Sequence, residues 1–176
     1  MKILDATCGT KSMWFQKNHP LVTYMDKRSG NFLYWNKTKA EKTVVKINPD
    51  VVSEWKDMPF DNNHFDMVLF DPPHIIQKGD SKNPIKMEVY YSYLPKDSWR
   101  EILKDGIDEL FRVLKPEGVF VFKWAETKVS IDEILKLFPY PPIFGNRTKD
   151  LNKAKNDTVH WLLFLKYNVN SKLDIN

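Results

Sequence analysis

Ten residues, FDMVLFDPPH at Phe65–His74, decide how the rest of the chain is interpreted. The first six form a short apolar run, which predicts a buried strand rather than a helix because two prolines follow it at once. Pro73 also disfavours helical geometry at the preceding residue, so the chain should leave the strand extended. Asp71 is therefore expected at the carboxyl end of a core strand, the edge of an α/β sheet where ligands bind.

The four residues that end this stretch form a compact group suited to an amine on a flat molecule. The Asp71 carboxylate can accept a hydrogen bond from an amine. Pro72 and Pro73 make the turn rigid, and the ring of His74 can stack on a flat substrate. An ordinary strand-ending turn is the alternative for these four residues taken alone.

The start of the chain has the order of a nucleotide-binding βαβ unit. Met1–Asp5 is predicted as a strand, followed by a turn of small residues and a helix over Lys11–Lys17. A second strand, Leu21–Met25, ends at Asp26. The separation from Asp5 to Asp26 matches the roughly 20 residues expected before an acid that binds a ribose. The alternative is that Asp26 is a solvated loop charge beside two basic residues.

The remaining predicted strands are Thr43–Ile47, Val119–Trp124 and Thr158–Tyr167, and the remaining predicted helices are Trp99–Leu114 and Ser130–Phe138. Ser98 and Ser130 are each followed three residues later by a glutamate, which predicts a capping box at the start of both helices. Alternating strands and helices predict an α/β, doubly wound, mostly parallel sheet. We expect a single domain over residues 1–168 and a polar tail over 169–176.

Three polar segments are candidates for substrate contact. Basic and aromatic residues are interleaved in Ser29–Lys42, which either contacts a nucleic-acid strand or packs at the domain edge. Ile75–Ser98 is long and polar and follows His74, which predicts a lid or substrate wall. Gly145–Asn156 is a basic loop rich in turn residues. The candidate substrate-binding residues are Lys78, Lys82, Tyr90, Tyr91, Lys123, Trp124 and Lys149.

Asp71–His74 resembles motif IV of class I amino-methyltransferases that use S-adenosylmethionine, whose pattern is Asp or Asn, two prolines and an aromatic residue. LDATCG at Leu4–Gly9 resembles their motif I, except that Thr10 and Lys11 replace the second glycine. MDKR, MPF, RVLKPEG and FVFKW follow in the family's order, so the resemblance spans roughly the whole chain. It points to the small DNA adenine- or cytosine-amine methyltransferases of phages and mobile elements. It implies a Rossmann-like class I fold with a seven-stranded sheet and an antiparallel last strand.

The resemblance also implies S-adenosylmethionine as cofactor, with S-adenosylhomocysteine as product. Asp5 would face the ammonium group of the methionine moiety, and Asp26 would accept the ribose hydroxyls. Glu54 would meet the adenine amine, with Asp50 and Asp57 as competitors. The implied cofactor-binding residues are Asp5, Ala6, Thr7, Cys8, Gly9, Asp26, Lys27, Glu54 and Asp71.

The activity implied by the resemblance is methyl transfer to an exocyclic amine of a nucleic-acid base. Adenine in DNA is the first choice, and adenine or guanine in RNA and cytosine in DNA are alternatives. The amine would bond to the Asp71 carboxylate and the Pro72 carbonyl, His74 would stack on the base, and a base in a duplex would be flipped out first. The implied catalytic residues are Asp71, Pro72, Pro73 and His74.

Three other functions stay open at this point: methylation of a small molecule, methylation of a protein amide, and an inactive cofactor-binding scaffold that serves a partner. The chain is too short for a separate target-recognition domain. Specificity would therefore come from the loops or from a partner protein.

Composition excludes several other classes of protein. The 176 residues are 42% hydrophobic with a net charge of +4, which is typical of a globular protein and mildly favours an anionic partner. No apolar run approaches the roughly 20 residues that a membrane span needs. One cysteine and no signal-peptide pattern predict a cytoplasmic protein. The four histidines form no convincing ligand cluster, so no metal is expected.

Overall fold

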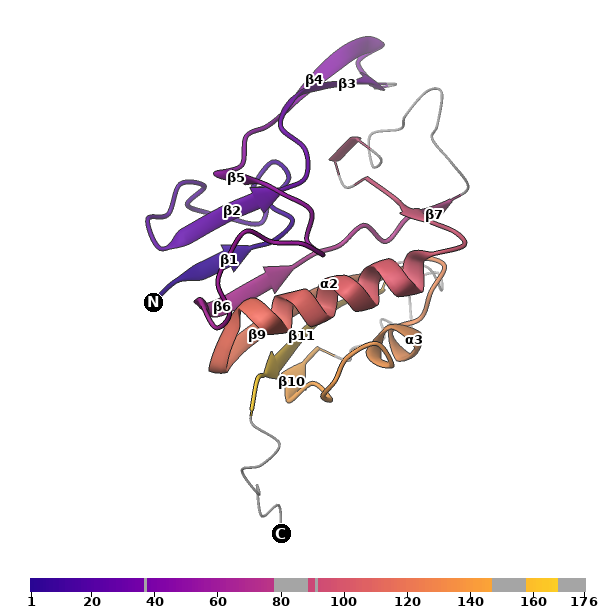
Figure 1. Ribbon diagram of the computed structural model, residues 1–176. Helices are drawn as coiled ribbons and strands as arrows, with labels where there is room; N and C mark the ends of the chain where they lie inside the picture. The colour runs from indigo at the N-terminus through magenta and orange to yellow at the C-terminus, as the bar shows by residue number, and fades with distance from the viewer. Residues whose placement is uncertain (37, 78–88, 91, 147–157, 168–176) are drawn as a thin grey trace.

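The computed structural model describes residues 1–36, 38–77, 89–90, 92–146 and 158–167, and a seven-stranded sheet forms its centre (Figure 1). The strands, in their order across the sheet, are β10 (Phe144–Gly145), β11 (Thr158–Leu165), β9 (Leu114–Glu126), β6 (Phe65–Phe70), β1 (Ile3–Asp5), β2 (Val22–Asp26) and β5 (Val51–Val52). β5, β2, β1, β6 and β9 pair in parallel, whereas β11 is antiparallel to both β9 and β10. The predicted mostly parallel sheet with an antiparallel last strand is confirmed.

The order in which the chain adds strands to the sheet reverses between β1 and β6. From β1 the chain proceeds to β2 and β5 on one side, and then crosses to β6 on the other side. A crevice outside the carboxyl ends of the strands is expected at such a switch point. Asp5 and Asp71 stand at the carboxyl ends of the two strands that flank it, with Asp5 paired in register to Leu69.

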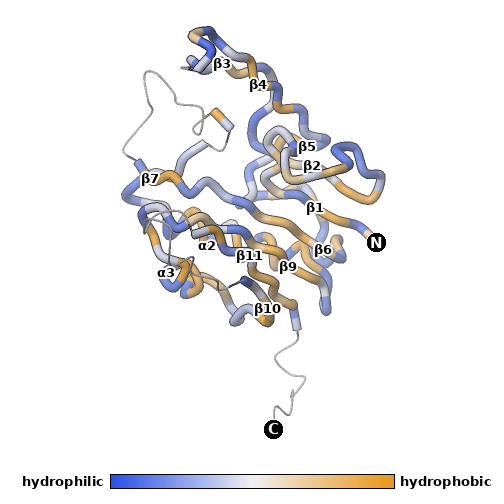
Figure 2. The backbone as a smooth tube through the Cα atoms, turned by 180° about the vertical axis from the view of Figure 1, so that it is seen from behind, coloured by the Kyte–Doolittle hydropathy of each residue, from blue (hydrophilic) through white to orange (hydrophobic). Residues whose placement is uncertain are grey.

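One long helix, α2 (Trp99–Val113), packs on the sheet along an apolar stripe, as predicted. Leu103, Ile107 and Leu110 are wholly buried on that stripe, and Phe111 meets Phe120 of β9 edge to face at 5.1 Å. In Figure 2 the hydrophobic segments gather along β1, β6 and β9. The predicted strand Val119–Trp124 lies within β9.

The two predicted capping boxes have different outcomes. Ser98 precedes α2 with a ψ of 7°, and its side chain makes no capping hydrogen bond, so that prediction is wrong. A capping serine needs an extended conformation to aim its hydroxyl at the first turn. Ser130 has that conformation and accepts from the Glu133 N–H at the start of α3 (Ile131–Leu135). α3 is also shorter than predicted, because the chain turns before Pro139.

The helix predicted over Lys11–Lys17 is absent, and turns cover this part of the sheet instead. Lys11 has a left-handed φ of 56°, which a helix does not allow. The indole of Trp14 donates to the Asp5 carboxylate at 2.7 Å, and its ring packs against Tyr24. Lys11, expected to be an exposed helix-start residue, places its Nζ 4.0 Å from the centre of the Tyr24 ring.

Between β2 and β5 a β-hairpin takes the place of a crossover helix. It consists of β3 (Gly30–Asn36) and β4 (Glu41–Ile47), paired only with each other. Thr43–Ile47, predicted as the third strand of the main sheet, belongs to this hairpin, and β5 occupies that sheet position. Tyr34, Val45 and Ile47 form a small core with Val89.

Two short strands pair near the beginning and the end of the predicted lid, Ile75–Ser98. β7 (Ile76–Gln77) pairs in parallel with β8 (Leu94–Pro95), and the Leu94 N–H donates to the carbonyl of Ile75 at 2.8 Å. Half of Ile75–Ser98 and most of Gly145–Asn156 lie outside the described residues, as does the predicted tail. Within the part of the chain that is described, no helix is both long and apolar enough to cross a membrane.

Candidate active site

A cleft opens at the switch point of the sheet, where the segments after β1, β2 and β6 meet. It is open to solvent, and the space within it, counting its open mouth, is about 550 Å³. Its wall is formed by Ala6, Thr7, Cys8, Gly9, Thr10, Ser12, Met13, Asp26, Lys27, Arg28, Trp55, Asp71, Pro73, Tyr90 and Ser92. The structure thus brings most of the predicted cofactor-binding residues to one place, together with Asp71.

The turn Ala6–Gly9 is tied to both neighbouring strands. The Ala6 N–H donates to a β6 carbonyl (3.0 Å), and the Cys8 N–H donates to a β2 carbonyl (2.8 Å). The Thr7 hydroxyl accepts from the backbone N–H of Asp71 at 3.0 Å. Gly9 has a φ of +50°, and a Cβ there would meet the carbonyl oxygen of Tyr90 at 3.5 Å. A side chain at this position would be strained, which explains the glycine.

Asp5 lies beneath this turn rather than in the cleft wall. It is wholly buried, and its carboxylate accepts from the Trp14 indole (2.7 Å) and the Thr7 N–H (3.2 Å). Burial raises the pKa of Asp5 to about 6, against the effect of these two hydrogen bonds, and the charges of Asp71 and Asp26 raise it further. Asp5 thus supports the turn, and its contact with the methionine ammonium group stays a prediction.

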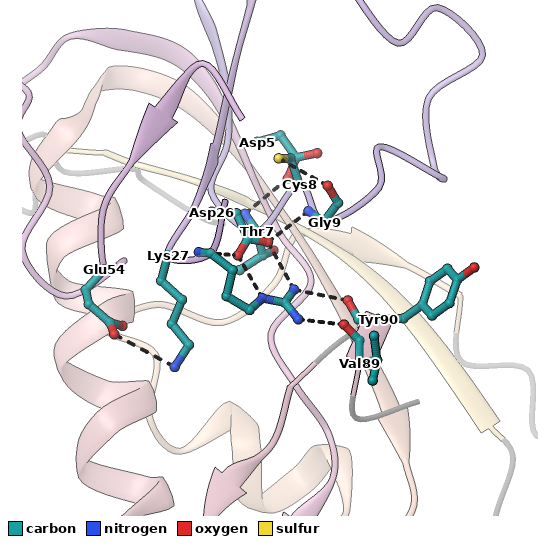
Figure 3. A network of polar contacts seen from close by, with 10 residues as sticks. Asp5, Thr7, Cys8, Gly9, Asp26, Lys27, Glu54, Val89 and Tyr90 are labelled. Carbon is teal, nitrogen blue, oxygen red and sulfur yellow. Dashed lines mark hydrogen bonds and ion pairs between the residues drawn. The ribbon is translucent and has the colours of Figure 1, made fainter. Parts of the chain in front are cut away.

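Asp26 is 5% exposed and is saturated with hydrogen bonds (Figure 3). One carboxylate oxygen accepts from the Gly9 N–H (3.0 Å) and from Nη2 of Arg28 (3.2 Å). The other accepts from the backbone N–H (2.9 Å) and Nε (3.0 Å) of Arg28. A carboxylate has about four acceptor positions, so all of those of Asp26 are in use.

Arg28 joins Asp26 to the segment that returns from the predicted lid. Its Nη1 donates to the carbonyl of Val89 at 2.8 Å, and its Nη2 donates to the carbonyl of Tyr90 at 3.1 Å. These contacts draw residues 89–90 across the Gly9 turn. The sequence analysis assigned Arg28 no role, although its place two residues after a strand-ending acid is a signal of pairing.

The three candidate acids for an adenine amine lie in different settings. Glu54 follows the carboxyl end of β5 and pairs with Lys27 (Nζ to Oε1, 3.8 Å) at a hollow that adjoins the cleft through Lys27 and Trp55. Asp50 is bound to the β2 backbone at 2.9 Å. Asp57 lies in a turn, where its N–H donates to the carbonyl of Glu54. Only Glu54 combines a strand end with a position beside the cleft.

At the other end of the cleft, Asp71 forms a buried ion pair. It is 7% exposed, and Nζ of Lys123 in β9 donates to its Oδ2 at 2.6 Å. Burial raises the pKa of Asp71, and the Lys123 cation opposes that rise. Burial also lowers the pKa of His74, which is consistent with a neutral ring beside this pair.

The predicted substrate residues are only partly placed. Lys123 reaches Asp71, and its Nζ lies 5.7 Å from the ring of Trp161, which the sequence analysis did not single out. Trp124 is wholly buried, with its indole bonded to the Val129 carbonyl, so its predicted contact with substrate is wrong. The strand alternation places it with the core side chains of β9. The predicted residues outside the described ranges are Lys78, Lys82, Tyr91 and Lys149.

Tyr90 lines the cleft, with its ring against Tyr34 of the hairpin at 6.1 Å. Among the described residues, no cluster of three or more histidine, cysteine or acidic side chains could hold a metal ion.

No protein-family model matches the chain, and no curated protein matches it. Solved structures do. The 1,6-didemethyltoxoflavin-N1-methyltransferase of Burkholderia thailandensis, with bound 1,6-didemethyltoxoflavin and S-adenosylhomocysteine, aligns at a TM-score of 0.52 and 13% identity, over 94% of this chain and 71% of that one. A SAM-dependent methyltransferase of Methanosarcina mazei aligns at 0.52 and 10%, over 94% and 92%. One of Leishmania major aligns at 0.51 and 8%, over 93% and 64%. At these identities the likeness shows the fold: the chain has the Rossmann-like class I methyltransferase fold.

Proposed function

We propose that this protein is an S-adenosylmethionine-dependent methyltransferase that acts on an exocyclic amine of a nucleic-acid base, with adenine in DNA as the first choice. One observation carries the proposal. Asp71, with one oxygen held by Lys123, opens on the same cleft as the Gly9 turn and Asp26. A cofactor seat and an amine acceptor therefore share one pocket at the switch point.

The residues of the cleft fit the cofactor. Gly9 allows close approach of the backbone, Trp55 offers a flat apolar wall, and Asp26 and Glu54 are acceptors for hydroxyl and amine groups. Because Asp26 is saturated, a ribose hydroxyl would take the place of a donor from Arg28. When bound, the cofactor supplies a methyl group activated by a sulfonium.

The acceptor end is built to aim an amine. The lone pair of an exocyclic amine is delocalised into the ring, so the nitrogen needs orientation before it can attack a methyl carbon. Oδ1 of Asp71 and the carbonyl of Pro72 would each accept one amine hydrogen, and His74 would stack on the base. The nitrogen would gain the methyl group from the sulfonium, with S-adenosylhomocysteine as the leaving group, and would lose one proton to the Asp71 carboxylate. Lys123 favours the ionised carboxylate that this role requires.

Methylation of a small molecule is the second candidate. The Burkholderia neighbour is an N1-methyltransferase crystallised with a small heterocycle, and this chain shares its fold and has a cleft at the switch point of the sheet. Substrate choice would then lie with the cleft. In the nucleic-acid case it would lie with the loops or with a specificity partner protein.

Methyl transfer from labelled S-adenosylmethionine to single- and double-stranded DNA, RNA and free heterocyclic amines tests the proposal. We expect label on DNA, recovered as N6-methyladenine after digestion. Asp71→Ala serves as the inactive control. Asp66→Ala, on the same strand but at its amino end, serves as the active one. Label on small heterocycles alone would favour the second candidate.

A further inference from the structure

The β3–β4 hairpin has one covered face and one open face. Tyr34 and Val45 point into the small core shared with Val89. The opposite face, called here the hairpin outer face, consists of Asn31, Leu33 and Trp35 from β3 and Lys42, Val44 and Lys46 from β4, all of them exposed. Figures 1 and 2 show the hairpin projecting at the end of the molecule opposite β10 and β11.

Apolar and basic side chains are paired across this face. The register sets Leu33 opposite Val44 and Trp35 opposite Lys42. Trp35 is 56% exposed and Leu33 54%. Directly opposed side chains on an antiparallel pair are neighbours, so an exposed indole stands beside an ammonium group. The face carries no carboxylate.

We propose that the hairpin outer face binds single-stranded nucleic acid next to the base that enters the cleft, an inference that rests on the proposed function. Trp35 supplies a ring on which a base can stack, with Leu33 beside it as apolar support. Lys42 and Lys46 supply cations for phosphates. Stacking rings with interspersed cations are the usual means of holding single strands without reading their sequence.

A basic hollow links this face to the active site. It encloses about 590 Å³, counting its open side, and Lys11, Lys17 and Lys46 contribute to its wall. Lys46 belongs to the hairpin outer face, and Gly9 and Thr10, which also line the hollow, line the cleft as well. Lys11 is partly balanced by Asp50, 3.9 Å away. A strand seated on the hairpin thus has a cationic path that ends at the cleft.

A protein partner is less well suited to this face. The cores of protein interfaces are depleted in lysine, and their tryptophan anchors are surrounded by groups that exclude water. Here the residue opposite Trp35 is Lys42, and Lys46 follows on the same edge. Those positions match a polyanion.

The test measures binding of a fluorescent single-stranded oligonucleotide by anisotropy at several salt concentrations. Loss of one stacked base costs about 1–3 kcal/mol, so Trp35→Ala should weaken binding about 5- to 150-fold with an unchanged salt slope, and Trp35→Phe should retain most of the affinity. Lys42→Gln with Lys46→Gln removes two phosphate contacts. It should flatten the slope of log affinity against log salt by about 1.4.

Matched controls lie on the far side of the molecule. Phe144→Ala removes an exposed ring on β10. Lys104→Gln with Lys136→Gln removes two charges, one within α2 and one directly after α3. Both controls should bind like the unmodified protein. Equal affinity and salt slope for the Trp35→Ala and double-lysine variants would overturn the inference and leave a protein as the partner of this face.

Methyl transfer by the unmodified protein to the same oligonucleotide separates this inference from the proposed function. Transfer that all hairpin variants retain with unchanged KM would leave the proposed function standing and overturn the hairpin site. Binding that depends on Trp35 without transfer to any nucleic acid would uphold the hairpin site and contradict the proposed function.

Discussion

Asp26 ends β2 and Asp71 follows β6, the two strands that flank β1, and each carboxylate is buried beside a cation. They differ in how much acceptor capacity remains. Asp26 receives four hydrogen bonds, from the Gly9 N–H and from Arg28. Among the described residues, only Lys123 donates to the Asp71 carboxylate. Two buried acids therefore suit different tasks: Asp26 holds loops together, and Asp71 is open to a new donor.

The largest effect expected from this contrast concerns the rate. Asp71→Ala should lower methyl transfer about 10³-fold or more, because the amine loses its charged acceptor, while cofactor affinity changes only a few-fold. Asp71→Asn keeps one acceptor oxygen, so its rate of methyl transfer should lie between those of Asp71→Ala and the unmodified protein. Calorimetry with S-adenosylhomocysteine measures the change in cofactor affinity. Cofactor binding lost as completely as activity would mean that Asp71 belongs to the cofactor seat.

Asp5, between the two acids, should control part of the pH dependence of stability. Its pKa is raised to about 6 by burial, so its stabilising contribution is complete below its ordinary value of 3.8 and is lost as pH rises through about 6. The free energy of unfolding should lose roughly 3 kcal/mol across that window relative to Asp5→Asn. Urea unfolding of both proteins from about pH 4 to pH 8 measures the difference. Parallel curves would show that Asp5 does not titrate there.

Asp26→Ala should weaken S-adenosylhomocysteine binding by roughly tenfold or more, because hydrogen bonds to a charged group contribute about 1.5–3 kcal/mol. Transfer rate at saturating cofactor should change much less. An unchanged dissociation constant would mean that Asp26 only anchors the loops. Asp26 would then have a structural role, whereas Asp71 would have a catalytic one.

The smallest effect concerns Lys123. Lys123→Met removes the cation that opposes the raised pKa of Asp71, so the acid limb of the pH profile of kcat/KM should move to higher pH. Lys123→Arg should restore much of the original profile. A limb that stays in place would show that Lys123 does not act through Asp71.

Much of this fold could be predicted because its strands carry local signals. The apolar run before Asp71, the acid after the first strand and the stripe of α2 each specify an element through a few adjacent residues. The connections could not be predicted in the same way. The hairpin depends on Tyr34 and Val45 meeting Val89, which is distant in the sequence. The turns after Gly9 depend on Trp14 reaching Asp5.

The candidate site shows the same division. Residues at strand ends, such as Asp26 and Asp71, follow from the pattern. Arg28 and Lys123 acquire their roles from partners that only folding supplies. Trp124 is the exception, because the alternation of Phe120, Phe122 and Trp124 marks all three as core residues.

The lengths of the strands have a consequence for solubility. Both outer strands of the main sheet, β5 and β10, are two residues long, so they offer a foreign strand almost no template for pairing. The hairpin strands have seven residues each and belong to no larger sheet. Among the described strands, those of the hairpin therefore offer the longest template for pairing, and Lys42 and Lys46 stand beside the exposed apolar residues Leu33, Trp35 and Val44. Because charged side chains on exposed strands disfavour pairing with another copy, the two lysines that would bind phosphates are also expected to oppose aggregation.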